Sequence, residues 1–249
     1  MNALGKTHKG IKRTNNEDAY IILTEQISCL SNLYIVADGM GGHQAGEIAS
    51  SDAIKAFCDY IRSRDCEIED ILDFLTDATK HANREIFEKS CKDPAFTGMG
   101  TTFTACTIKD SKGYVSHIGD SRIYIVNENG IKMLTTDHSY VQEMVKAGEL
   151  TQEEADCHPI RNALTRALGT SVDLQVDGYI FDVKRGDKIL MCTDGLTNMI
   201  SENEIKDIVQ GSENLEEATE ELIRMANENG GADNITNILI EVVGDIDGA

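Results

Sequence analysis

Apolar and polar residues repeat along this chain with two periods, and the period changes near residue 100. In the N-terminal third, two runs typical of strands, AYIIL and LYIVAD, come first. Residues 46–62 and about 68–90 then repeat apolar side chains at the spacing of an amphipathic helix. The pattern therefore predicts two strands followed by a pair of helices.

Short strand-like runs separated by turns that end in glycine begin at Thr101. TFTACTI and YVSHIG flank the turn KDSKG, and RIYIV and IKMLT flank NENG, so both pairs predict hairpins. Three later runs also predict strands: LQVDGYIF, KILMCTDG and NITNILIEVV.

Helix signals interrupt these strands. Residues 140–147 have helical spacing and stop at Gly148, and residues 215–231 form a helical stretch that ends in glycine. Capping-box patterns at 151–154 and 201–204 predict two further helix starts. The polar, partly helical segment from about 137 to 162, called the flap below, is predicted to leave the core beside the functional site and to tune substrate choice.

Hairpin strands in two sets, with helices inserted as pairs, favour antiparallel sheets over a parallel βαβ sheet. We therefore predict an α+β fold of two packed sheets with helices outside each. With 249 residues, no repeat and no Pro-rich linker, the chain suits a single domain, 1–249, that includes the flap.

The net charge bears on whether nucleic acids or phosphate esters can bind this protein. The formal net charge is −20, and no basic stripe is visible, so nucleic acid is excluded as a partner. An acidic protein also repels phosphate esters at long range. If phosphate is the target, bound cations and a local arginine must reverse the sign within the site.

Cysteines and apolar runs indicate the compartment. The seven cysteines include no C-x-x-C pair, which indicates reduced thiols rather than a disulfide framework. The longest apolar runs have the length of a strand, and the N-terminus lacks the apolar core of a secretory signal. We therefore expect a cytoplasmic protein without a membrane partner.

Four aspartates stand where strand-like runs give way to glycine-rich turns. They are Asp38, Asp120, Asp194 and Asp233. One such residue is an ordinary turn residue, but the carboxylates of NNED, Glu17 and Asp18, join this set. Carboxylates that crowd together repel unless a hard cation such as Mg²⁺ or Mn²⁺ lies between them. The pattern therefore predicts a metal-dependent enzyme.

Seven ordered motifs make the prediction specific. They are RTNNED (13–18), VADGMGGHQAGEIAS (36–50), GMGTT (98–102), GDSR (119–122), LTRALG (164–169), CTDGL (192–196) and GADNIT (231–236). Together they resemble the signature series of the metal-dependent protein Ser/Thr phosphatases, the type 2C or PPM family, and of its compact bacterial members in particular. This resemblance spans nearly the whole chain and implies a four-layer α-β-β-α sandwich.

The resemblance also implies a binuclear Mn²⁺ or Mg²⁺ centre. Asp38 would bridge the two metals. The Gly39 carbonyl and Glu17 would serve one metal, while Asp194 and Asp233 would serve the other. A water shared by two such cations has a lowered pKa, so hydroxide is available to attack phosphorus in line, without a phosphoenzyme.

Three further residues take roles from the same resemblance. Asp18 would orient metal-bound water, and Arg13 would grip the substrate phosphate, because its planar fork matches two phosphate oxygens. Asp120, together with Asp194, would support a third, weaker metal.

The general acid stays unassigned. Many eukaryotic members carry His directly after the D-G, whereas this chain has Met40 there, as in the bacterial DGMGG form. His43 is a candidate; His117 is predicted to be structural, and His138 and His158 flank the flap.

Other interpretations are weighed on the same residues. GKT at 5–7 is rejected as a phosphate loop, because it lacks the first glycine and a preceding strand. GMGTT and LTRALG are interpreted as structural, so Arg166 is not predicted to be catalytic.

The favoured function is hydrolysis of phosphoserine and phosphothreonine in phosphorylated proteins by a monomer, opposed by a Ser/Thr kinase. The alternative is a catalytically silent phosphoprotein-binding regulatory module on the same fold. Activity on small phosphate esters is a third possibility.

Overall fold

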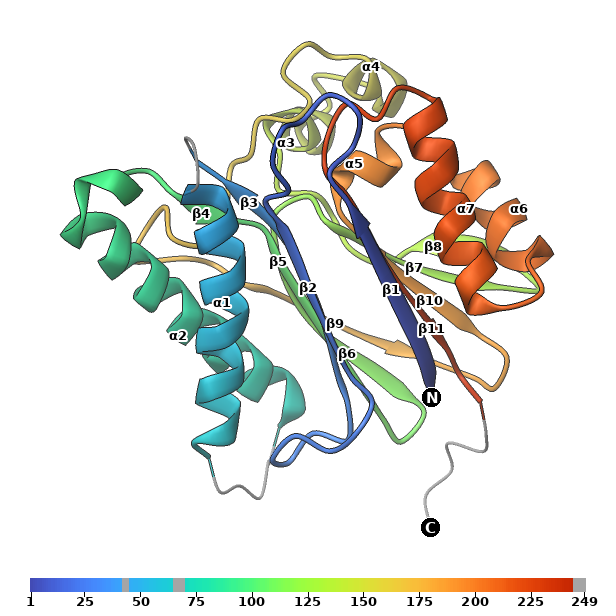
Figure 1. Cartoon of the computed structure of the whole chain (residues 1–249), viewed down its shortest axis with the longest axis horizontal. Coiled ribbons are helices and arrows are strands. Elements are labelled where there is room, and N and C mark those ends of the chain that lie inside the picture. Colours follow the sequence, from blue (N-terminus) through green and yellow to red (C-terminus); the bar gives the residue numbers. More distant parts are fainter. Residues whose placement is uncertain (42–44, 65–69, 244–249) are drawn as a thin grey trace.

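The computed structural model describes residues 1–41, 45–64 and 70–243 and contains two antiparallel sheets (Figure 1). The first sheet has the strand order β1-β11-β10-β7-β8. Its strands are β1 (Asn2–His8), β7 (Arg122–Asn127), β8 (Gly130–Met133), β10 (Lys188–Cys192) and β11 (Ile235–Glu241).

The second sheet has the strand order β2-β3-β5-β6-β9, and the short β4 pairs with β3. Its strands are β2 (Asp18–Leu23), β3 (Leu33–Met40), β4 (Gly100–Thr101), β5 (Phe103–Lys109), β6 (Lys112–Ile118) and β9 (Asp177–Asp182).

The described residues also form helices, some of which cover the outer faces of the two sheets (Figure 1). They are α1 (Ala45–Arg62), α2 (Ile71–Lys92), the 3₁₀ turn η1 (Pro94–Phe96), α3 (Tyr140–Ala147), α4 (Gln152–Asp156), α5 (Asp194–Thr197), α6 (Glu202–Gly211) and α7 (Leu215–Glu228). Figure 1 shows α1 and α2 outside the sheet that contains β2, and α6 and α7 outside the sheet that contains β1.

Strand β3 shows how one sequence run fills two core layers. Leu33, Ile35 and Ala37 pack in the cluster that includes α1 and α2, while Tyr34 and Val36 face the layer between the sheets. Successive strand side chains point to opposite faces, so burial on both faces requires a continuous apolar run. The predicted four-layer α-β-β-α sandwich is confirmed.

The predicted helix starts and the predicted helix end are also confirmed. Thr151 and Ser201 both begin helices in complete capping boxes, with Glu154 and Glu204 as their partners. Gly148 ends α3 in the left-handed region, at φ 76°.

The structure differs from the predicted elements at three places. The N-terminal segment NALGKTH was not predicted as a strand, because its own pattern is weak; it forms β1 through pairing with β11. The predicted strand 174–181 begins later, at Asp177. The run KILMCTDG leaves the sheet after Cys192, and Asp194 starts the short helix α5. The predicted start of the second helix, Ile68, lies outside the described residues.

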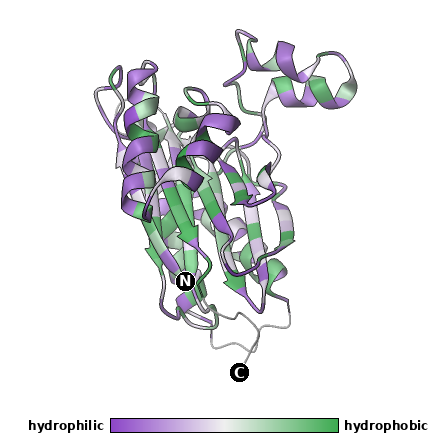
Figure 2. Cartoon of the chain, turned by 90° about the vertical axis from the view of Figure 1, so that its right-hand side faces the viewer, coloured by the Kyte–Doolittle hydropathy of each residue, from purple (hydrophilic) through white to green (hydrophobic). Residues whose placement is uncertain are grey.

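The flap contains α3 and α4, and it stands off the body of the molecule in Figure 2. Its two ends are held together at the base, where Tyr140 N donates to Ala163 O (2.9 Å) and Thr165 N donates to His138 O (2.8 Å). Among the residues that the structure describes, no helix is both long and apolar enough to cross a membrane.

Candidate metal centre

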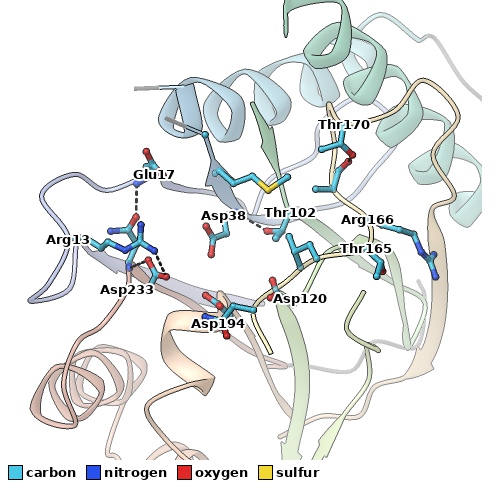
Figure 3. Close-up of a pocket in the computed structure, with 17 residues that line it drawn as sticks. Arg13, Glu17, Asp38, Thr102, Asp120, Thr165, Arg166, Thr170, Asp194 and Asp233 are labelled. Carbon is cyan, nitrogen blue, oxygen red and sulfur yellow. Dashed lines mark hydrogen bonds and ion pairs between the residues drawn. The ribbon is translucent and has the colours of Figure 1, made fainter. Parts of the chain in front are cut away.

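A cavity of about 530 Å³ opens beside the flap base and contains most of the predicted site (Figure 3). Seven predicted residues line it: Arg13, Glu17, Asp38, Gly39, Asp120, Asp194 and Asp233. In Figure 3, Asp38 lies centrally, with Asp194 and Asp120 on one side and Glu17 on the other. The structure thus brings together residues that are more than 200 positions apart in the sequence.

Strand pairing places two of the carboxylates opposite each other. In the antiparallel register of β2 and β3, Asp18 is the direct partner of Asp38. The backbone of Asp38 is fixed by Thr102, whose N donates to Asp38 O (2.9 Å) and whose Oγ1 accepts from Asp38 N (2.8 Å). The two side chains therefore stand side by side on rigid backbone.

Asp18 is held from behind by two hydroxyl groups. Its Oδ2 accepts from Thr193 Oγ1 (2.9 Å) and from Thr236 Oγ1 (2.6 Å). Its Oδ1 is buried and has no hydrogen-bond partner among the described residues. One carboxylate oxygen is thus anchored while the other stays available.

A close backbone approach brings Asp194 and Asp233 together. A methyl group at Gly195 would lie 1.9 Å from Asn234 O, so only glycine fits after Asp194. Asn198 Nδ2 donates to Asp194 Oδ2 (2.9 Å), while the buried Asp194 Oδ1 has no partner within the described chain. Asp194 therefore resembles Asp18, because one carboxylate oxygen accepts a hydrogen bond and the other has none.

Glu17 and Gly39 meet at the start of α1. Gly39 N donates to Glu17 O (3.1 Å), and a methyl group at Gly46 would lie 2.7 Å from the Glu17 carboxyl carbon. The Glu17 carboxyl group therefore lies against the first turn of the helix, where the helix dipole favours a negative charge.

Arg13 reaches into the cavity from an exposed loop and lies 2.8 Å from Asp233 Oδ2. Asn234 organises this loop: its Nδ2 donates to Lys9 O and Asn15 O, and its Oδ1 accepts from Glu17 N (2.8 Å). The sequence analysis missed this role of Asn234. Its position directly after Asp233, in GADNIT, was the available signal.

Asp120 is the most enclosed of the carboxylates, with only 8% of the residue exposed. It follows Gly119, which has φ 104° and whose Cβ, if present, would lie 2.6 Å from the Thr102 side chain. Thr102 Oγ1 in turn lies 2.8 Å from Ser121 Oγ. Thr102 therefore contacts both the backbone of Asp38 and the residues on either side of Asp120.

Burial and mutual repulsion raise the pKa of the clustered carboxyl groups. Burial is the main cause for Asp18, whose pKa rises to about 7, and for Asp194, whose pKa rises to about 6. Burial, followed by the neighbouring carboxylates, raises the pKa of Asp38 and of Asp120 well above the usual range. Without a cation these carboxyl groups are therefore harder to ionise than ordinary aspartates.

The donor set fits hard divalent cations. All the available atoms are oxygens, the type of ligand that Mg²⁺ and Mn²⁺ prefer, and two buried carboxylate oxygens lack partners. Among the described residues, however, no three His, Cys, Asp or Glu side chains are close enough to enclose an ion. The carboxylates line the cavity without forming a closed shell, and Asp233 is paired with Arg13.

Among the described residues, no histidine lines the cavity, so the general acid stays unassigned. His43 lies outside the described residues, and Met40 lines the cavity at the position after the D-G. His117 is buried against Thr104 Oγ1 (2.9 Å), as its predicted structural role requires. His138 is buried at the flap base, and His158 lies in the flap after α4.

The raised carboxyl pKa values predict how the stability of the metal-free protein depends on pH. A buried carboxyl group whose folded pKa exceeds its unfolded value of about 3.9 favours the fold while it is protonated. This stabilisation is lost as the pH rises through about 6 to 7, the values for Asp194 and Asp18. We expect the Tm measured in chelator to be lower at pH 8 than at pH 6, and Mn²⁺ to raise it more at pH 8. A Tm that rises from pH 6 to pH 8 in chelator would contradict this.

Comparisons with known proteins agree over the whole chain. A protein-family model described as Protein phosphatase 2C matches residues 5–240. The chain is 39% identical over 237 residues to Protein phosphatase PhpP of Streptococcus pneumoniae, covering 95% of each chain. The structure of the S. agalactiae serine/threonine phosphatase is 37% identical with a TM-score of 0.90, covering 97% of this chain and 99% of that one. The catalytic domain of serine threonine protein phosphatase PstP, in complex with 2 manganese ions, is 32% identical with a TM-score of 0.84, covering 98% of both.

Proposed function

The chain belongs to the protein phosphatase 2C family and is a protein serine/threonine phosphatase, and we propose that it works through two divalent metal ions held in the carboxylate-lined cavity. Asp38 would contact both ions. The Gly39 carbonyl and Glu17 would serve one, and Asp194 and Asp233 the other. Asp120 would support a weaker third ion together with Asp194.

One observation carries this proposal. Carboxylates from separate segments of the chain line one open cavity. Within the described chain, the buried Oδ1 of Asp194 in this cavity and the buried Oδ1 of Asp18, which does not line it, lack hydrogen-bond partners. Leaving such atoms unpaired is costly unless something binds them. When bound, two divalent cations would lower the pKa of a shared water, so that hydroxide is available near neutral pH to attack the phosphate.

The residues of the chain divide the remaining work. Arg13 would bind two oxygens of the substrate phosphate and balance their negative charge. Asp18, fixed through its Oδ2 by Thr193 and Thr236, would orient a water molecule by accepting a hydrogen bond from it at the free Oδ1. The acidic walls exclude an unshielded phosphate, so substrate binding would depend on the loaded site.

The substrates in this proposal are phosphoproteins, with a Ser/Thr kinase as the opposing enzyme. The flap would tune the choice among them, because its base forms part of the cavity wall at Asn162. We also keep the cytoplasmic location and the monomeric state as part of the proposal.

The proposal is tested by hydrolysis of a phosphothreonine peptide by the purified protein, first with Mn²⁺ and then with excess chelator. We expect turnover with Mn²⁺, its loss with chelator, and its return when Mn²⁺ is added again. A small phosphate ester assayed in parallel shows whether the peptide is preferred. Turnover that persists in chelator would contradict the metal mechanism. A folded protein inactive in both conditions would favour the phosphoprotein-binding module instead.

A further inference from the structure

Two buried histidines lie at the flap base, outside the carboxylate cluster. His117 and His138 are 0% and 1% exposed, and their ring centroids are 4.9 Å apart. The proposed reaction uses neither ring. A buried polar ring needs defined partners to be tolerated, so the question is what these partners are.

His138 is bonded to both sides of the cavity through its backbone and its ring. Its N donates to Gly119 O (2.8 Å), and its Nδ1 accepts from Gly119 N (3.1 Å). On the other side its O accepts from Thr165 N (2.8 Å). One residue thus ties the backbone before Asp120 to the flap's return segment, which lines the cavity from Leu164 to Ala167.

The geometry fixes the tautomer of His138. Because Nδ1 accepts a hydrogen bond from Gly119 N, the neutral ring carries its proton on Nε2. Nε2 has no hydrogen-bond partner within the described chain, but it lies 3.2 Å from Asp177 Oδ2, and Asp177 Oδ1 accepts from Arg166 Nη1 (2.7 Å). The ring therefore extends the connection to Arg166, the next residue of the return segment.

The ring of His117 packs against the ring of His138 and has defined partners of its own. Its Nε2 lies 3.2 Å from Thr136 O, which only accepts, so this nitrogen carries the proton and Nδ1 accepts from Thr104 Oγ1. Burial lowers the pKa of His117 to about 3 and also lowers the pKa of His138. Both rings are accordingly neutral near pH 7, each with one defined tautomer.

We propose that His138 is a positioning residue that holds two walls of the cavity at a fixed distance from each other. One wall is the backbone at Gly119 and Asp120, and the other is the return segment from Leu164 to Ala167. Its Nδ1 and N bond to the backbone of Gly119, next to Asp120. Its O bonds to Thr165 N, and its Nε2 lies against Asp177, the partner of Arg166. The proposal rests on the proposed function, which assigns Asp120 on the first wall to metal binding; contact of the second wall with the substrate is part of the present proposal.

Two conservative variants separate the two contacts. In His138→Asn the amide oxygen takes the place of Nδ1, so the bond from Gly119 is kept while the contact with Asp177 is lost. In His138→Gln the amide nitrogen takes the place of Nε2, so the contact with Asp177 is kept while the bond from Gly119 is lost. His81→Asn, on α2 and away from the flap, is the matched control.

We expect His138→Asn to raise KM for a phosphothreonine peptide by roughly threefold to tenfold, the effect of losing one polar contact, with Mn²⁺ binding unchanged. We expect His138→Gln to weaken the weakest Mn²⁺ binding step, the one assigned to Asp120 and Asp194, by about tenfold. Titration calorimetry of the metal-free protein measures this step, and KM at saturating Mn²⁺ should be unchanged. Asp177→Ala should reproduce the effect of His138→Asn.

The proposal is overturned if the folded variants match the His81→Asn control in KM and Mn²⁺ binding. It is also overturned if both His138 variants change both quantities equally, since that indicates general loosening. If the His138 variants do not fold, Asp177→Ala and the ¹⁵N spectrum of His138 in the wild-type protein decide, because a proton on Nδ1 contradicts the assignment. If the wild-type protein has no phosphatase activity, the proposed function fails, while calorimetry and the spectrum still test the positioning role.

Discussion

Replacing Asp38 by asparagine is expected to lower kcat/KM for a phosphothreonine peptide by on the order of a thousandfold, with the fold intact. Asp38 is the central carboxylate of the cavity, and its backbone is held by Thr102 independently of its side chain. The asparagine has almost the same shape but carries no charge for two cations to share. The measurement is steady-state hydrolysis at saturating Mn²⁺, with circular dichroism to check folding.

The same variant should gain stability when metal is absent. Burial and the surrounding carboxylates raise the pKa of Asp38, so a neutral amide relieves repulsion, and we expect a higher Tm in chelator than for the wild type. Asp173→Asn removes a charge from an exposed residue and is the matched control; it should keep full activity. Near-normal turnover by the folded Asp38→Asn variant would contradict the assigned role of Asp38.

Replacing Arg13 by lysine is expected to lower kcat/KM by about a hundredfold, although the positive charge is kept. A lysine ammonium is a point charge, whereas the guanidinium fork binds two phosphate oxygens at once. The loss of one charge-assisted contact to the transition state has an effect of this size. The measurement is the split between kcat and KM over a range of peptide concentrations.

Arg13 is also paired with Asp233, so its substitution has a second consequence to control. Mn²⁺ titration of Arg13→Lys separates a change in metal binding from a change in substrate binding. Lys12→Ala removes the neighbouring exposed charge and should change kcat/KM less than twofold. If Lys12→Ala and Arg13→Lys had equal effects, Arg13 would contribute only to the general potential of the surface.

Much of the architecture was readable in the chain because it depends on local pattern. The run at β3 is apolar on both faces because helices lie on one side and a second sheet on the other. The capping boxes at Thr151 and Ser201 start helices by bonds within one turn. These features need only neighbouring residues, so the sequence pattern predicts them.

The candidate carboxylates were also found from the sequence, but their supports were not. Thr102, Thr193, Thr236 and Asn234 hold the site through bonds to residues distant in the chain. A threonine in or beside a strand has no sequence mark that distinguishes a core residue from a support for a carboxylate. Likewise, β1 forms because β11 provides its partner, although its own pattern is weak.

The sequence by itself determined the two-sheet architecture, the family and which carboxylates are candidates for the site, since apolar period and motif order are local properties of the chain. Only the tertiary structure decided which oxygen of Asp18 and of Asp194 is free, how Arg13 pairs with Asp233, and that His138 joins the two walls of the cavity. The physical reason is that hydrogen-bond partners and burial arise between segments far apart in sequence, and their geometry exists only after the two sheets have packed.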